Sequence, residues 1–268
     1  MSKDYKDLKV GIDEDLDEKL QRLVPGYSAY HILKESVDAR KRHDIHKVLS
    51  VRVFEKGETP PAHEIKVDKI KWSAKAPVIV GAGPAGLFAA LRLVERGIPC
   101  VLLERGSEAN TRLKAINRFW RYGELQPDDN VCFGEGGAGL YSDGKLITRI
   151  KSDFIPYVMR RLVEFGAPKE IEYLANPHVG SDRIRRLIPI IRNYLVANGC
   201  EIHFNTKVSE ILRSQTPPNG KARITGVKTG TGKVFDTDHL ILATGHSASD
   251  IFKILQEMEI KLEGKSFA

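Results

Sequence analysis

The chain has 268 residues, of which 41% are hydrophobic and 29% charged, and its formal net charge is +7. This length suits one large domain and a small one, and the composition is that of an ordinary globular protein rather than a disordered or fibrous one. The positive charge permits an anionic partner. However, the densest basic runs, residues 40–47 and 183–186, are typical of solvated faces, so we do not expect nucleic acid as a partner.

The cysteines and the N-terminus bear on the compartment. Cys100, Cys132 and Cys200 form no C-x-x-C pair and no metal-ligand spacing, which argues against a dithiol–disulfide reductase or a metal site and fits a reducing environment. Residues 1–10 lack the apolar segment of a secretory signal, and the apolar stretch 76–91 is too short to span a membrane. We therefore expect a cytoplasmic protein without a membrane partner. The sequence leaves the oligomeric state open.

Residues 1–72 predict a small α+β domain. The expected elements are, in order, a strand at 8–12, a helix at 13–24, and strands at 31–39 and 46–55. This β-α-β-β order is compatible with a ferredoxin-like domain. The polar segment that follows contains Pro60 and Pro61 and predicts a linker, or a loop leading into one further strand.

Residues 73–268 predict a Rossmann-like α/β domain with a β-meander. Unbroken apolar runs favour strands that are buried on both faces, and a period of 3.6 favours helices. The expected elements are a strand at 77–83, a helix at 85–97, a strand at 99–106, a helix at 181–199, a strand at 200–208, meander strands at 210–214, 222–230 and 232–236, and a last buried strand at 239–245.

Gly81, Gly83 and Gly86 form a G-x-G-x-x-G motif directly after a predicted strand and at the start of a predicted helix. The first glycine allows a tight turn, the second lets the backbone approach a pyrophosphate, and the third lets the helix pack closely on the strand. The helix N-terminus attracts phosphates, so Pro84 and Ala85 are expected beside the ligand as well. The motif predicts a dinucleotide site, with a ligand-free turn as the alternative.

Glu104 ends the second buried strand, 23 residues after Gly81, and Arg105 follows it. A carboxylate at this position can accept hydrogen bonds from both ribose hydroxyls of an adenosine. It also disfavours a 2′-phosphate on that ribose. We therefore place Glu104 and Arg105 in the site and do not expect NADP as the nucleotide held there.

Two later segments resemble those of known flavoproteins. Residues 240–245 are similar to the A-T-G motif that closes the β-meander in two-dinucleotide-fold flavoproteins of the glutathione-reductase-like superfamily. Residues 204–211 resemble the segment that these proteins lay against the adenine. The resemblance therefore implies cofactor contacts from five residues: Lys207, Val208, Ala243, Thr244 and Gly245.

With residues 133–149 and 243–250 included, the span 77–268 resembles a bacterial family of NAD(P)/FAD-dependent oxidoreductases, and residues 1–72 resemble its N-terminal segment. The resemblance implies an FAD-dependent dehydrogenase or reductase. In such an enzyme a hydride passes through flavin N5, NAD(P)H is a transient co-substrate, and the substrate is a small molecule that the sequence does not identify.

The segment 133–146 contains five glycines, and the resemblance implies that it runs beside the ribityl chain and the flavin ring. Close backbone approach would explain four of them: Gly134, Gly136, Gly137 and Gly139. The alternative is a glycine-rich hairpin loop without a ligand.

Catalytic candidates are few. Lys145 would lie near the flavin, with a solvated lysine as the alternative, and His246 would face the substrate, with a helix-start histidine as the alternative. His178 is a proton donor or a loop residue, while Glu135 and Asp143 are turn residues or catalytic acids. Core packing, rather than stacking on a ring, is the expected role of three aromatic residues: Trp120, Tyr122 and Tyr141.

One departure from the family concerns the C-terminal part. Such flavoproteins carry a second glycine–aspartate motif, after a further domain, which holds the ribityl-pyrophosphate region of FAD. Only residues 251–268 follow the A-T-G segment here, so we expect an incomplete flavin half of the site. Two other functions stay open: a flavin-dependent tRNA-modifying protein, and a non-catalytic fragment that binds a dinucleotide or a partner.

Overall fold

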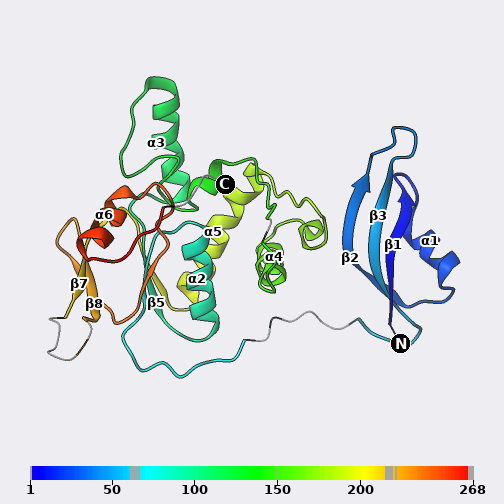
Figure 1. Cartoon of the computed structure of the whole chain (residues 1–268), viewed down its shortest axis with the longest axis horizontal. Coiled ribbons are helices and arrows are strands. Elements are labelled where there is room, and N and C mark those ends of the chain that lie inside the picture. The colour runs from blue at the N-terminus through cyan, green and yellow to red at the C-terminus, as the bar shows by residue number, and fades with distance from the viewer. Residues whose placement is uncertain are drawn as a thin grey trace. The chain divides into compact units, whose positions relative to one another are not determined.

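The computed structural model describes residues 2–60, 65, 67–148, 150–214, 220 and 222–264. The chain divides into two compact units (Figure 1). Unit 1 comprises Met1–Lys66 and Lys145–Gly180, and unit 2 comprises Val67–Gly144 and Ser181–Ala268. The sequence-based ranges were 1–72 and 73–268, so the segment Lys145–Gly180 groups with the N-terminal residues instead of with its neighbours in the sequence.

Unit 1 contains a three-stranded antiparallel sheet in the order β1-β3-β2. Its elements are β1 (Lys3–Gly11), α1 (Leu16–Leu23), β2 (Ala29–Asp38), β3 (His46–Phe54), α4 (Ile155–Glu164) and the 3₁₀-helix η2 (Lys169–Glu172). Leu20 of α1 is fully buried and packs with Val10, Leu49 and Val51 of the sheet. The β-α-β-β order is as predicted, and the ferredoxin-like assignment stays a prediction.

Strand β1 begins five residues before the expected start, at Lys3 instead of Leu8. The early residues pair with the end of β3, with Lys3 opposite Val53, and the register shifts between Tyr5 and Leu8. Asp7, at that irregularity, has a positive φ of 52°. Residues 3–7 lack the apolar alternation of a half-buried strand because all of them except Tyr5 are exposed.

The outer edge of β2 explains why Lys145–Gly180 belongs to unit 1. The backbone N–H of Glu35 donates to the carbonyl of Tyr173 at 2.9 Å, and the N–H of Ala175 donates to the carbonyl of Glu35 at 2.8 Å. This pairing joins Glu35 and Leu174 in a parallel bridge. The segment thus covers part of a sheet edge that would otherwise be open.

Unit 2 is built on a four-stranded parallel sheet in the order β10-β4-β5-β6. The strands are β4 (Val78–Val80), β5 (Cys100–Leu103), β6 (Cys200–His203) and β10 (Leu240–Leu242), and the main helices are α2 (Pro84–Glu95) and α5 (Ser181–Ala197). This confirms the α/β class with a parallel sheet. Cys100 and Cys200 are direct register partners and are both buried, as expected for core residues.

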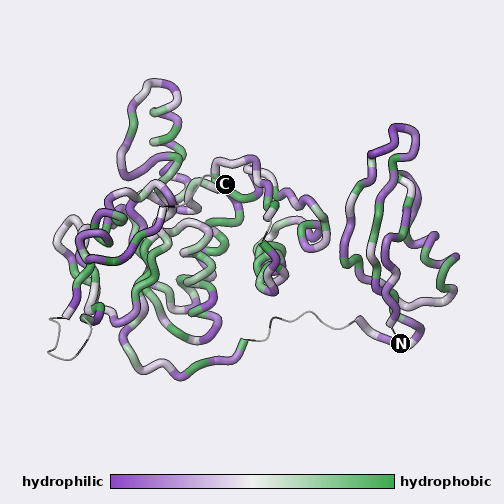
Figure 2. The backbone as a smooth tube through the Cα atoms, viewed as in Figure 1, coloured by the Kyte–Doolittle hydropathy of each residue, from purple (hydrophilic) through white to green (hydrophobic). Residues whose placement is uncertain are grey.

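The predicted β-meander is present in unit 2. It consists of β7 (Val208–Arg213), β8 (Ile224–Thr229) and β9 (Val234–Asp236), in the antiparallel order β7-β8-β9. Val208, Val227 and Phe235 of the meander share one apolar cluster with Val80 and Leu103 of the parallel sheet. Figure 2 shows hydrophobic residues along the parallel strands and α2. The helix α6 (Ser249–Glu257) packs against the same cluster through Ile254 and Leu255.

Helix α3 (Ala109–Tyr122) extends beyond the parallel sheet at its C-terminal end (Figure 1). Trp120 and Tyr122 lie there with exposed fractions of 60% and 70%, so the expectation that they pack in the core was wrong. Tyr141, at the end of the 3₁₀-helix η1 (Ala138–Tyr141), is partly buried, and the guanidinium groups of Arg112 and Arg185 lie 5.0 Å and 5.7 Å from its ring centroid. None of the helices in the described ranges is long and apolar enough to cross a lipid bilayer.

Candidate functional site

A cleft of about 530 Å³ opens in unit 2 at the carboxyl ends of β4, β5 and β10, where Val80, Leu103 and Leu242 line it. This volume lies in the usual range of small-molecule sites. The cleft brings together most of the residues predicted from the sequence: Gly81, Gly83, Pro84, Ala85, Glu104, Arg105, Gly134, Gly137, Val208, Ala243, Thr244, Gly245 and His246.

Some predicted residues do not line this cleft. Four are cofactor candidates: Gly86, Gly136, Gly139 and Lys207. Lys145 and His178 belong to unit 1, where they form an isolated antiparallel bridge. Conversely, sequence reasoning missed the apolar wall made by Ile251, Phe252 and Leu255. The available signal was their spacing along the sequence, because apolar residues one and three positions apart are typical of one face of an amphipathic helix.

The turn after β4 has the geometry of an anion site. Gly83 is the N-cap of α2 without a side-chain cap, and the first turn carries no acidic residue, so its N–H groups can serve an anionic ligand. Gly81 has a positive φ of 106°, and a Cβ there would overlap the carbonyl of Ala243. A Cβ at Gly86 would overlap the carbonyl of Gly81. The backbone packing of this turn therefore requires both glycines.

Glu104 is buried, and its carboxylate joins three backbone segments. Oε2 accepts a hydrogen bond from the N–H of Ala82 at 2.7 Å, while Oε1 accepts from Gly106 and Gly134, both at 2.9 Å. A carboxylate offers about four acceptor positions, so roughly one, on Oε2, is left for a ribose hydroxyl. Glu104 therefore connects the turn after β4, the end of β5 and the glycine-rich loop to one another.

The glycine-rich loop approaches other backbone segments of its own unit. The N–H of Gly136 donates to the carbonyl of Ala82 at 2.9 Å. A Cβ on Gly137 would lie 3.0 Å from the Cα of Gly83, and one on Gly106 would lie 2.6 Å from the Cα of Gly134. Intramolecular packing therefore accounts for several of these glycines before any ligand is considered. Gly139 differs, since the nearest atom to its Cβ would be Cγ of Pro84 at 3.8 Å.

This difference predicts opposite outcomes for two alanine substitutions in unit 2. Gly106→Ala forces its methyl group against backbone atoms of Gly134, and we expect a loss of about 1–3 kcal/mol in the free energy of unfolding. Gly139→Ala has room and should leave stability unchanged or raise it by up to about 1 kcal/mol. Urea titrations followed by tryptophan fluorescence test both, and equal effects of the two variants would contradict the packing argument.

Arg112 of α3 is completely buried and holds the glycine-rich loop from inside. Its guanidinium donates at 2.7–3.3 Å to five carbonyl oxygens: Nε to Asn130, Nη2 to Val131, and Nη1 to Gly134, Glu135 and Gly137. Burial lowers the pKa of Arg112, although nearby Tyr141 and Glu104 act in the opposite direction. A buried cation is tolerated when it is hydrogen-bonded, and here each of the three guanidinium nitrogens donates to at least one carbonyl oxygen. Sequence analysis did not single out this residue.

Glu135 lies in a turn, which was one of its two predicted roles, and its side chain is buried. Its Oε2 accepts a hydrogen bond from the N–H of Ala109 at 2.8 Å, at the start of α3. Its Oε1 lies 3.4 Å from Nε of Arg192 on α5. Burial raises the pKa of the Glu135 carboxyl. Arg112 and Glu135 therefore connect the glycine-rich loop to α3 through buried hydrogen bonds. Glu135 does not line the cleft.

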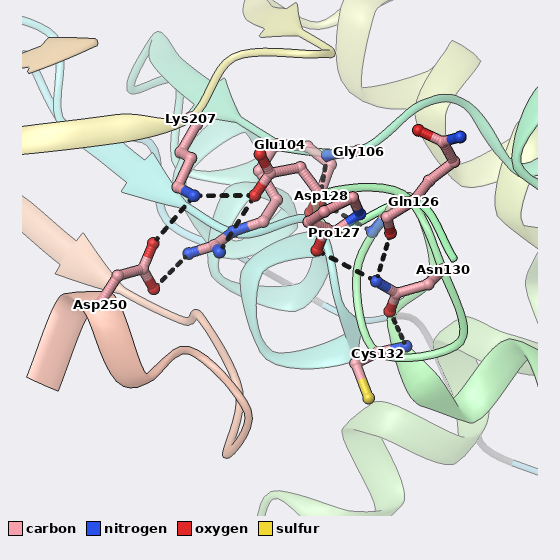
Figure 3. A network of polar contacts seen from close by, with 11 residues as sticks. Glu104, Gly106, Gln126, Pro127, Asp128, Asn130, Cys132, Lys207 and Asp250 are labelled. Atoms are coloured by element: carbon pink, nitrogen blue, oxygen red, sulfur yellow. Dashed lines mark hydrogen bonds and ion pairs between the residues drawn. The ribbon is translucent and has the colours of Figure 1, made fainter. Parts of the chain in front are cut away.

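Arg105, Lys207, Asp128 and Asp250 form an ionic cluster beside the cleft (Figure 3). Arg105 contacts Asp250 at 2.8 Å and Asp128 at 3.5 Å, while Lys207 contacts the same two carboxylates at 3.5 Å and 2.9 Å. The guanidinium of Arg105 also stacks over the ring of Phe133, at 4.3 Å from its centroid. Burial raises the pKa of Asp250, but the hydrogen bond from Arg105, the charges of Arg105 and Lys207 and the backbone N–H of Ile251 together outweigh burial and lower it.

The fold and this site define a dinucleotide-binding α/β unit. Residues 75–117, which contain β4, the turn, α2, β5 and Glu104, match a family model described as an FAD binding domain. This match supports FAD as the nucleotide of unit 2.

The chain is 36% identical over 283 residues to an uncharacterised protein of Clostridium beijerinckii, and the alignment covers 97% of the chain and 52% of that relative. The chain thus spans about half the length of this relative. Similar solved structures include THI4 of Thermovibrio ammonificans (19% identity, 70% of this chain and 64% of that one, TM-score 0.47). Another is an L-amino acid deaminase of Proteus vulgaris (14% identity, 75% and 61%, TM-score 0.42).

Proposed function

We propose that the cleft of unit 2 binds the ADP portion of FAD. The observation that carries this proposal is the convergence of the uncapped α2 N-terminus, the Glu104 carboxylate and residues 243–245 on one cleft. The match of residues 75–117 to an FAD binding domain agrees with it. In this arrangement the first-turn N–H groups orient the pyrophosphate, and the remaining acceptor position of Glu104 holds a ribose hydroxyl.

The bound flavin would make the protein an oxidoreductase, because FAD supplies hydride transfer at its N5 atom. We propose NAD(P)H as the electron partner and a small molecule as the substrate. His246 lines the cleft and is the side chain that would hold or move a proton there.

Ala85 offers a sharp test of nucleotide binding. It is exposed, lines the cleft and lies in the first turn of α2. In Ala85→Asp, the new carboxylate should stabilise the helix N-terminus but repel a pyrophosphate, and we expect the affinity for FAD to fall by at least about tenfold with no loss of stability. Ala85→Asn is the neutral control of similar size and should lower the affinity less.

Affinity is measured by titrating the protein with FAD and following the quenching of flavin fluorescence. Equal affinities for the wild type, Ala85→Asp and Ala85→Asn would place the nucleotide elsewhere. The redox part is tested separately, by adding NADH or NADPH to the FAD-loaded protein without oxygen and following flavin absorbance. Bound FAD that neither reductant bleaches would contradict NAD(P)H as the electron partner.

A further inference from the structure

The ionic cluster beside the cleft contains two cations, Arg105 and Lys207, and each of them is paired with aspartates. Arg105 directly follows Glu104 and lines the cleft, and its guanidinium is held by Asp250 and Asp128 on its edge and by Phe133 on its face. Lys207 is bound by the same two aspartates. Counting these four side chains and the buried Glu104, the local charge is two positive against three negative.

The two aspartates are fixed by different elements. Asp250 lies in the first turn of α6. Asp128 lies in a loop that Asn130 closes, because the Asn130 side chain donates to the carbonyls of Gln126 and Pro127 at 2.8 Å and 3.1 Å (Figure 3). The next residue, Asp129, accepts hydrogen bonds from the backbone N–H and the hydroxyl of Ser107. Asp128 is therefore anchored close to the end of β5.

A ribose held by Glu104 would have this cluster as its neighbour. A phosphate group on that ribose carries nearly two negative charges and binds where an arginine or lysine is available to it. Here both cations are already paired with aspartates, and the carboxylates around them outnumber the cations. An unmodified hydroxyl carries no such charge and needs only one acceptor.

We propose that Asp128 and Asp250 determine the nucleotide specificity of the cleft: by holding Arg105 and Lys207, they exclude nucleotides with a 2′-phosphate on the adenosine ribose. This inference rests on the proposed dinucleotide site. It assigns the discrimination to two residues outside the glycine motif and separate from Glu104.

The test compares ADP-ribose with 2′-phospho-ADP-ribose, which differ only in that phosphate, by isothermal titration calorimetry. The wild type should bind ADP-ribose at least about tenfold more tightly. In the double variant Asp128→Asn/Asp250→Asn, the ratio of the two dissociation constants should shift by about tenfold toward the phosphorylated ligand. Each single variant should shift it less.

The matched control is Asp4→Asn/Asp38→Asn. These aspartates pair with Arg52 and Arg40 in unit 1, so the control makes the same change in net charge and also releases two cations. It should leave the ratio unchanged. Adding Arg105→Met and Lys207→Met to Asp128→Asn/Asp250→Asn should abolish the shift in the ratio of dissociation constants, because the two cations that the double variant releases are then absent.

The outcomes separate two failures. If the wild type does not bind ADP-ribose, the proposed nucleotide site is wrong and the inference falls with it. If ADP-ribose binds but neither the double nor the single variants shift the ratio, the site stands and the inference is overturned. A shift that persists without Arg105 and Lys207, or that the control reproduces, also overturns it.

Discussion

Replacing Glu104 by glutamine is expected to destabilise unit 2 by roughly 3–5 kcal/mol and to weaken nucleotide binding at the same time. The carboxylate accepts three backbone hydrogen bonds in a buried position. Glutamine keeps the shape but has one acceptor oxygen, and its amide N–H groups would face backbone N–H groups. The turn after β4 and the glycine-rich loop would then lose their common anchor.

Tryptophan fluorescence suits this measurement because both tryptophans, Trp72 and Trp120, belong to unit 2. Urea titrations give the free energy of unfolding, and FAD titrations give the affinity. Glu124→Gln is the control, since Glu124 forms an exposed ion pair with Arg118 and should change stability by less than about 1 kcal/mol. If Glu104→Gln changed the free energy of unfolding by less than about 1 kcal/mol, the three backbone N–H groups would not need a charged acceptor, and the prediction would be wrong.

Removing the Arg112 side chain should lower the free energy of unfolding at least as much as Glu104→Gln does, by roughly 4–6 kcal/mol. This loss is comparable to the total stability of many domains. Arg112→Ala removes one donor from each of five carbonyl groups in residues 130–137 and opens a cavity next to Tyr141. Arg112→Lys keeps the charge but has three donors, so an intermediate loss is expected.

Arg118→Ala is the matched control, because Arg118 lies on the same helix with an exposed side chain. Limited proteolysis gives an independent readout. In Arg112→Ala, cleavage between residues 123 and 137 should appear at protease concentrations that leave the wild type and Arg118→Ala intact. The absence of both destabilisation and new cleavage would contradict the role assigned to Arg112.

Much of unit 2 was predictable from the sequence because its strands and turns have strong local signals. Unbroken apolar runs marked β4, β5 and β10, and the glycine motif marked the start of α2. The expected strand at 77–83 was too long, since β4 ends at Val80 and Gly81 already has a turn conformation. The assignment of the cofactor residues stays a prediction, although most of them line one cleft.

The interior of the site was not predictable from local pattern. Arg112 and Glu135 are charged, and charged side chains are usually exposed, so nothing in the periodicity of α3 or the loop reveals their burial. Their partners are distant in the chain: Ala109, which donates to Glu135, lies 26 residues before it, and Arg192 lies far after it on α5. Glu104 was correctly placed at the end of a strand, but its three backbone partners depend on how two loops fold back on it.

The pairing of β2 with residues 173–175 has a consequence for how the chain is made. During synthesis on the ribosome, β2 emerges more than 130 residues before the backbone that completes its edge. All of β4, α2, β5 and α3 are translated in that interval. Nascent chains shorter than about 175 residues therefore display an open strand edge, and this edge is where a chaperone should bind them and where truncated products should aggregate.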